Sequence, residues 1–87
     1  MASYELVFKK SVAKDLRPLP KIEVRRIMEC VRALSANPRP IGCEKLSGQE
    51  RYRVRQGSYR IIYEIEDERV RVLIVKVAHR REAYRTA

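Results

Sequence analysis

Residues 70–78, VRVLIVKVA, constrain the fold more than any other stretch of the chain. In an extended conformation this stretch places apolar side chains on both faces, so neither face suits contact with water. The run is far too short to cross a bilayer. It therefore predicts a strand that lies centrally in a sheet.

Two further strands are predicted directly before this one. Residues 52–55, YRVR, alternate, with Tyr52 and Val54 on one side and Arg53 and Arg55 on the other. Residues 59–65, YRIIYEI, are rich in β-branched and aromatic residues, which favour strands. Residues 56–58 and 66–68 are predicted turns. We expect Tyr52 and Val54 to face the core, and Arg53 and Arg55 to lie on the opposite, exposed face.

The N-terminal half predicts one strand and two helices. Residues 4–8 alternate as in a short strand, and Ser11 is expected to cap a short helix that Pro18 stops. From Lys21 to about Ser35, apolar residues recur at helical spacing, which predicts an amphipathic helix. Its buried stripe comprises Val24, Ile27, Met28, Val31 and Leu34. Residues 38–50 are predicted to form a loop.

The predicted order of elements is β-α-α-β-β-β. Two helices packed on one face of a small, mainly antiparallel sheet form a two-layer α+β domain. The length of 87 residues fits one domain, residues 1–87. The helices cover one face of the sheet, which leaves the other face for binding.

The cysteines and the N-terminus favour a cytoplasmic protein. Residues 1–8 lack the long apolar stretch and cleavage site of a signal peptide. Cys30, in the predicted helix, and Cys43, in the predicted loop, lack the spacing of a zinc motif and are expected to be reduced thiols. No membrane association, metal site or cofactor is expected.

The charge is strongly basic and unevenly spread. Lys and Arg number 20 against 11 Asp and Glu, a net charge of +9. Residues 51–60 contain four arginines and no acidic residue, and residues 79–85 add three more arginines. Such a field attracts nucleic acid or an acidic protein, although a merely solvated surface has the same composition.

The chemistry-bearing residues are arginines, tyrosines and one histidine. Arg53, Arg55 and Arg60 are expected to lie close together around a hairpin, where a phosphodiester would relieve their mutual repulsion. Arg60 is expected to be exposed. His79, the only histidine, follows the central strand; an imidazole there suits a general base or a structural role. Tyr84 suits stacking on a base, proton transfer or docking of the chain end.

These residues lie in a pattern that resembles the RelE family of toxins. The stretch GSYRIIYEI is similar to the core hairpin of that family, and HRREAYR is similar to its usual ending. YELVFKKSVAKDLRPLP resembles its opening strand and helix, and ANPRPIGCEKLSG resembles its helix-to-strand loop. The resemblance covers almost the whole chain. It implies a toxin that cleaves messenger RNA in the ribosomal A site without a metal, leaving a 2′,3′-cyclic phosphate and a 5′-hydroxyl.

The resemblance also implies roles for individual residues. Arg60 matches the arginine that stabilises the transition state, and Arg80 matches a second catalytic arginine. Tyr84 matches the tyrosine that stacks on or orients the target base, and His79 matches the base of some relatives. The substrate-binding candidates are Lys45, Arg53, Arg55 and Arg81.

The nearest rival is the related ParE branch, whose members bind and inhibit DNA gyrase and are generally not nucleases. A third reading is a binding protein that meets only an acidic antitoxin. The RelE resemblance implies messenger RNA, the ribosome and a cognate acidic antitoxin as partners. The antitoxin is expected to fold on binding and to form a hetero-oligomer with the toxin.

Overall fold

The long apolar strand predicted from the sequence lies inside a five-stranded sheet, with a neighbouring strand on each side. The computed structural model describes residues 3–46, 48 and 50–79. The strands are β1 (Glu5–Phe8), β2 (Glu44–Lys45), β3 (Arg51–Gln56), β4 (Tyr59–Glu66) and β5 (Arg71–His79). They lie in the order β1-β5-β4-β3-β2. The pair β1–β5 is parallel and the other three pairs are antiparallel.

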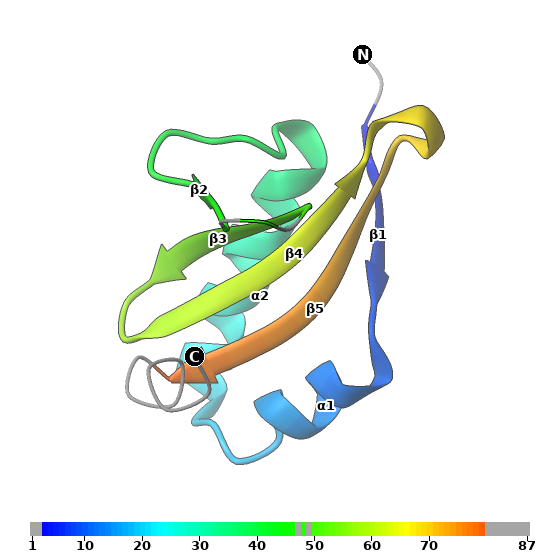
Figure 1. Cartoon of the computed structure of the whole chain (residues 1–87). Helices are drawn as coiled ribbons and strands as arrows, with labels where there is room; N and C mark the ends of the chain where they lie inside the picture. The colour runs from blue at the N-terminus through cyan, green and yellow to red at the C-terminus, as the bar shows by residue number, and fades with distance from the viewer. Residues whose placement is uncertain (1–2, 47, 49, 80–87) are drawn as a thin grey trace.

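Two helices complete an α+β fold of two layers. Helix α1 spans Lys10–Leu16 and helix α2 spans Lys21–Ala36, and a short 3₁₀ helix, η1 (Asp67–Arg69), joins β4 to β5. Figure 1 shows α2 behind the sheet and α1 beside the lower part of β5. The predicted two-layer architecture is confirmed, and α2 occupies nearly the predicted residues. No helix in the described part of the chain is long and apolar enough to cross a membrane.

The core lies between the helices and one face of the sheet. Ile27, Val31 and Leu34 of α2 are buried at the helical spacing predicted from the sequence. They meet side chains from alternating positions of β3, β4 and β5. The buried cluster comprises Val12, Ile27, Val31, Leu34, Val54, Ile61, Tyr63, Val72, Ile74 and Val77. We call the opposite face of the sheet, which α2 does not cover, the open face.

The structure corrects three local predictions. Helix α1 begins at Lys10, and no side chain caps its N-terminus, so Ser11 is not a cap. The predicted loop contains the two-residue strand β2, which pairs with β3 at Arg53 and Tyr52. The β3–β4 loop has two residues rather than three, because Gln56 pairs with Tyr59. Gly57 supplies the positive φ of 60° that a tight hairpin turn of this length requires.

Candidate nucleic-acid interface

The arginines of β3 lie on the open face. Arg51, Arg53 and Arg55 alternate with Tyr52 and Val54 along the strand. Val54 is buried in the core, and Tyr52 packs against the core and stacks on Tyr63 with ring centroids 5.9 Å apart. The prediction that Tyr52 and Val54 face the core, with Arg53 and Arg55 on the other face, is therefore confirmed.

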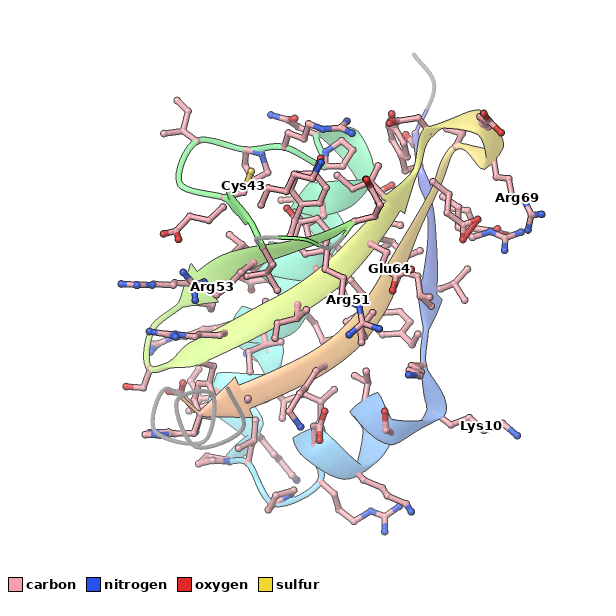
Figure 2. All side chains as sticks on the ribbon, in the orientation of Figure 1. Lys10, Cys43, Arg51, Arg53, Glu64 and Arg69 are labelled. Carbon is pink, nitrogen blue, oxygen red and sulfur yellow. The ribbon has the colours of Figure 1, made fainter. Side chains whose placement is uncertain are left out.

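Two of these three arginines are already paired with carboxylates. Arg51 Nε lies 2.9 Å from Glu64 Oε2 across the β3–β4 pair, and Figure 2 shows both side chains on the side of the sheet away from α2. Arg53 pairs with Glu44 of the edge strand β2. Arg55 is exposed and has no ion pair among the described residues. Arg55 is therefore the strand arginine best placed to receive a phosphate.

Arg60 lies beside Arg55, but it is not exposed. The two residues are direct partners in the β3–β4 ladder, and Ala78 of β5 lies on the other side of Arg60. Arg55 and Arg60 line a small cavity of about 60 Å³ together with the turn residues Gly57 and Ser58. Arg60 is only 3% exposed, so the expectation of an exposed side chain is wrong.

His79 lies on the other face of the sheet. It pairs with Tyr59 at the last position of the β4–β5 ladder, one step beyond Arg60 and Ala78. The imidazole meets the Tyr59 ring edge to face, with centroids 5.4 Å apart. Both rings line a cavity of about 390 Å³ beside α1, together with Asp15 and Val77. The structure therefore brings Arg55 and Arg60 together and places His79 at the same end of the sheet, on the helix side.

Of the remaining predicted site residues, the structure describes only Lys45, which is not part of this cluster. Lys45 lies on the edge strand β2, opposite Tyr52, and its Nζ is 3.7 Å from Glu50 Oε2. Arg80, Arg81 and Tyr84 lie outside the residues that the structure describes, and their roles stay predictions.

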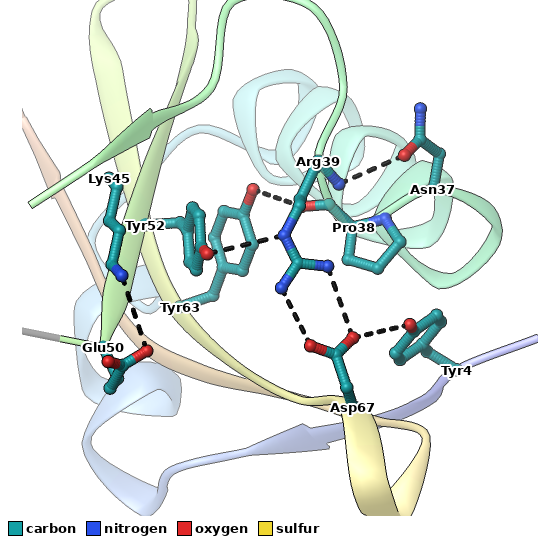
Figure 3. A network of polar contacts seen from close by, with 9 residues as sticks. All are labelled: Tyr4, Asn37, Pro38, Arg39, Lys45, Glu50, Tyr52, Tyr63 and Asp67. Atoms are coloured by element: carbon teal, nitrogen blue, oxygen red, sulfur yellow. Dashed lines mark hydrogen bonds and ion pairs between the residues drawn. The ribbon is translucent and has the colours of Figure 1, made fainter.

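The sequence reading missed a polar network at the far end of the sheet, shown in Figure 3. The Arg39 guanidinium binds both carboxylate oxygens of Asp67, at 2.9 and 3.3 Å. The Tyr4 hydroxyl donates to the same carboxylate at 2.8 Å, and Arg39 Nε donates to the Tyr52 hydroxyl at 3.4 Å. The hydrogen bonds from Arg39 and Tyr4 lower the pKa of Asp67 below its ordinary value. This network joins four segments that are distant in sequence, so no short sequence motif predicts it.

Tyr63 anchors the same region from within the core. Its side chain is completely buried, and its hydroxyl donates a hydrogen bond of 2.7 Å to the Pro38 carbonyl oxygen. Burial raises the pKa of Tyr63, so the phenol stays protonated as the donor this contact needs. The contact fixes the start of the loop that carries Arg39.

Comparisons with known proteins find relatives that match almost the whole chain. A family model described as the ParE toxin of the type II toxin–antitoxin system parDE matches residues 6–84. The chain is 35% identical over 81 residues to the toxin named RelE1 of Methanocaldococcus jannaschii, which covers 87% of this chain and 89% of that protein. It is 33% identical over 86 residues to toxin RelG of Mycobacterium tuberculosis, with 94% and 97% covered. The solved archaeal RelE–RelB complex from Pyrococcus horikoshii matches at 33% identity with a TM-score of 0.81, over 90% of this chain and 96% of that chain.

Proposed function

The chain belongs to the RelE/ParE family of toxins from type II toxin–antitoxin systems, and from that premise we propose that it is an endoribonuclease that cleaves messenger RNA without a metal ion. The observation that carries this proposal is the direct pairing of Arg55 and Arg60 at the tight end of the β3–β4 hairpin. Two guanidinium groups around a small cavity suit the two non-bridging oxygens of a phosphodiester.

The proposed reaction uses the RNA as its own nucleophile. The 2′-hydroxyl gives up its proton and attacks the adjacent phosphorus, so a P–O2′ bond forms while the P–O5′ bond breaks. The departing 5′-oxygen takes a proton and becomes a hydroxyl, which leaves a 2′,3′-cyclic phosphate on the other fragment. Because the nucleophile belongs to the substrate, the protein needs only to stabilise charge and to move two protons.

The arginines carry the electrostatic part of this reaction. Negative charge gathers on the phosphate oxygens as the phosphorane forms, so a fixed guanidinium binds that state more tightly than the ground state. Arg60 is buried, so its guanidinium has little freedom to move. Arg55 is exposed and meets the incoming phosphate first. Following the family resemblance, we assign Arg80 and Tyr84 to charge stabilisation and base orientation.

The proton transfers put a geometric requirement on the RNA. Arginine hardly deprotonates, so it cannot accept the 2′-hydroxyl proton. We assign this step to His79, which lies one ladder position from Arg60 but on the helix side of the sheet. The RNA must therefore pass over the end of the sheet, with its phosphate on the open face and the attacking ribose near the end of β5.

The proposed partners follow from the charge and from the relatives. The solved relative from Pyrococcus horikoshii is a RelE–RelB complex, and we propose that this chain likewise binds a cognate antitoxin and forms a hetero-oligomer with it. An acidic antitoxin segment fits the basic open face, which the RNA would otherwise use. We place the protein in the cytoplasm, where messenger RNA and ribosomes are available.

A second candidate function is inhibition of DNA gyrase. The observation that favours it is the matching family model, which is described as the ParE toxin. This function needs a binding surface but no arginine acting on a phosphorane.

Primer extension on cellular messenger RNA after brief induction separates the two candidates. We expect new 5′ ends at fixed positions within codons, and we expect them to disappear when translation is blocked beforehand. Intact messenger RNA in growth-arrested cells, with loss of DNA supercoiling, would favour gyrase inhibition instead.

A further inference from the structure

Strand β1 forms an outer edge of the sheet. It pairs with β5 on one side only, in a regular parallel register from Glu5 to Phe8. Figure 1 shows this strand at the side of the molecule, with none of the other described strands beyond it. An open edge presents backbone N–H and C=O groups that can pair with another chain, unless a proline or a β-bulge prevents it. Strand β1 contains no proline, and its register has no irregularity.

The free backbone groups of this edge belong to Leu6 and Phe8. The amides of Glu5 and Lys9 donate to carbonyl oxygens on the side of β5, at 2.8 and 2.9 Å. Because backbone groups alternate in direction along a strand, those of Leu6 and Phe8 point away from β5. Neither residue has a backbone hydrogen-bond partner on that side among the residues that the structure describes.

Only one antiparallel register lets a second copy of the chain use both residues. If Leu6 of each copy faces Phe8 of the other, both are hydrogen-bonded pairs, in which the residues exchange both N–H···O bonds. A register shifted toward the N-terminus needs the Tyr4 amide, which already donates to the end of α2 at 2.8 Å. A register shifted the other way needs Lys10, which begins helix α1. The available groups therefore specify a two-fold pairing centred on Val7.

The side chains of this edge complement one another in the same pairing. Glu5 of each copy lies opposite Lys9 of the other, and opposite charges in such cross-strand positions attract. Glu5 has Arg71 as its ladder partner on β5, at 3.4 Å, but 68% of its side chain is exposed, so its outer side is available. Phe8 is 40% exposed, and Leu6 of the second copy would cover it. An edge that is acidic at one end and basic at the other therefore matches itself when it is turned around.

We propose that the chain self-associates through β1, so that two copies join their sheets edge to edge. The proposal goes beyond the proposed function and does not depend on it. The net charge of +9 opposes the association of two copies, but salt at about 0.1 M screens charges that are more than about 10 Å apart, so the pattern at the edge decides. An acidic antitoxin strand would complement Lys9 but would repel Glu5. Strand β1 is separated from β3 by β5 and β4, so this pairing lies away from Arg55.

Amide hydrogen exchange on the full chain tests the pairing directly. Exchange is followed by NMR between about 20 µM and 1 mM protein, since an interface of one strand pair is small and therefore weak. We expect exchange at the amides of Leu6 and Phe8 to slow severalfold as the concentration rises, because these amides gain hydrogen bonds only in the dimer. Exchange at the Tyr4 amide, which is already bonded within each copy, should not change.

Charge reversal at the edge supplies the matched variants. Lys9→Glu makes both ends of the edge acidic and Glu5→Lys makes both ends basic, so each variant alone should dimerise about tenfold more weakly, since like charges then lie opposite each other. A mixture of the two variants brings opposite charges together again and should associate. Lys21→Glu changes the net charge as Lys9→Glu does, at an exposed position of α2, and should not weaken dimerisation. Sedimentation velocity measures the association, and thermal melts show whether each variant is folded.

Exchange at Leu6 and Phe8 that does not depend on concentration would overturn the proposal. Protection that appears only when an acidic antitoxin peptide is added would also overturn it, because the edge would then take an antitoxin strand. The same holds if the single variants associate like the unaltered chain, or if their mixture stays monomeric while the unaltered chain dimerises. If a variant does not fold, the exchange measurement on the unaltered chain decides.

Discussion

Arg60 differs from the other described arginines of the open face because its side chain is buried. Alternation along β3 correctly predicted which side Arg53 and Arg55 occupy, since the sequence itself carries that pattern. The side taken by His79 depends on how β4 pairs with β5. That register is set by the length of the connections and by the irregularity between Ile62 and Tyr63, neither of which a local pattern specifies.

Replacement of Arg60 should therefore affect both chemistry and folding. We expect Arg60→Ala to lower the cleavage rate by about a hundred- to a thousandfold, as loss of one transition-state donor does. We also expect a loss of about 1–3 kcal/mol in the free energy of unfolding, because a buried, interacting side chain is removed. Single-turnover cleavage and urea denaturation measure the two effects.

Arg55→Ala is the matched control for this experiment. It removes an exposed arginine from the same ladder pair, so stability should change by less than about 0.5 kcal/mol while binding of RNA weakens. If Arg60→Ala retains full cleavage activity under conditions where it is folded, the arginine-driven mechanism does not hold.

His79 has two roles in this account, and two variants separate them. His79→Phe keeps an aromatic ring but cannot accept a proton, so we expect kcat to fall while KM changes little. His79→Ala also removes the ring that packs beside Tyr59, so the free energy of unfolding should fall as well. The loss of kcat should shrink at high pH, because hydroxide can then take the proton of the 2′-hydroxyl. Normal kcat in His79→Phe would contradict the base role, and unchanged stability in His79→Ala would contradict the packing role of the ring.

At the scale of elements, the long pieces of the fold were predictable and the short ones were not. The apolar run of β5 and the stripe of α2 each carry enough residues to specify a strand and a helix. Strand β2 has only two residues. It forms because the edge of β3 has backbone groups available for pairing. The start of α1 is likewise set by the chain leaving β1, where Lys9 N–H binds the Ile74 carbonyl, and not by a capping side chain.

The network of Arg39, Asp67 and Tyr4 predicts a pH dependence at the far end of the sheet. The folded protein holds the pKa of Asp67 below its ordinary value of 3.8, so the contact stabilises above that value and its contribution is lost as pH falls through the folded pKa. Asp67→Asn should be less stable than the unaltered chain at pH 7, and the gap should close on acidification. The effect should be small because the pair is exposed.

Thermal melts between pH 7 and pH 2 measure this difference. Glu68→Gln, which changes the neighbouring carboxylate of η1, is the control and should show no such gap. A constant difference between Asp67→Asn and the unaltered chain at every pH would show that the carboxylate charge is not the stabilising feature.

At the scale of the whole molecule, the net charge of +9 governs association. Carboxylates already pair with Arg51 and Arg53. An acidic partner must therefore either displace these carboxylates or bind Arg55. We expect the affinity for the antitoxin to fall as salt rises from about 50 to 500 mM, since screening weakens attraction between exposed charges. Calorimetric titration at several salt concentrations measures it, and an affinity that does not depend on salt would indicate an apolar interface instead.

The central claim is that this toxin cleaves RNA by attack of the 2′-hydroxyl on the adjacent phosphate. The most direct measurement incubates the purified toxin with programmed ribosomes in parallel with Arg60→Ala, and analyses the ends of the RNA fragments. Our account predicts fragments that carry a 2′,3′-cyclic phosphate and a 5′-hydroxyl, formed by the unaltered toxin and strongly reduced by the variant. RNA that stays intact, or fragments with 5′-phosphates, would contradict it.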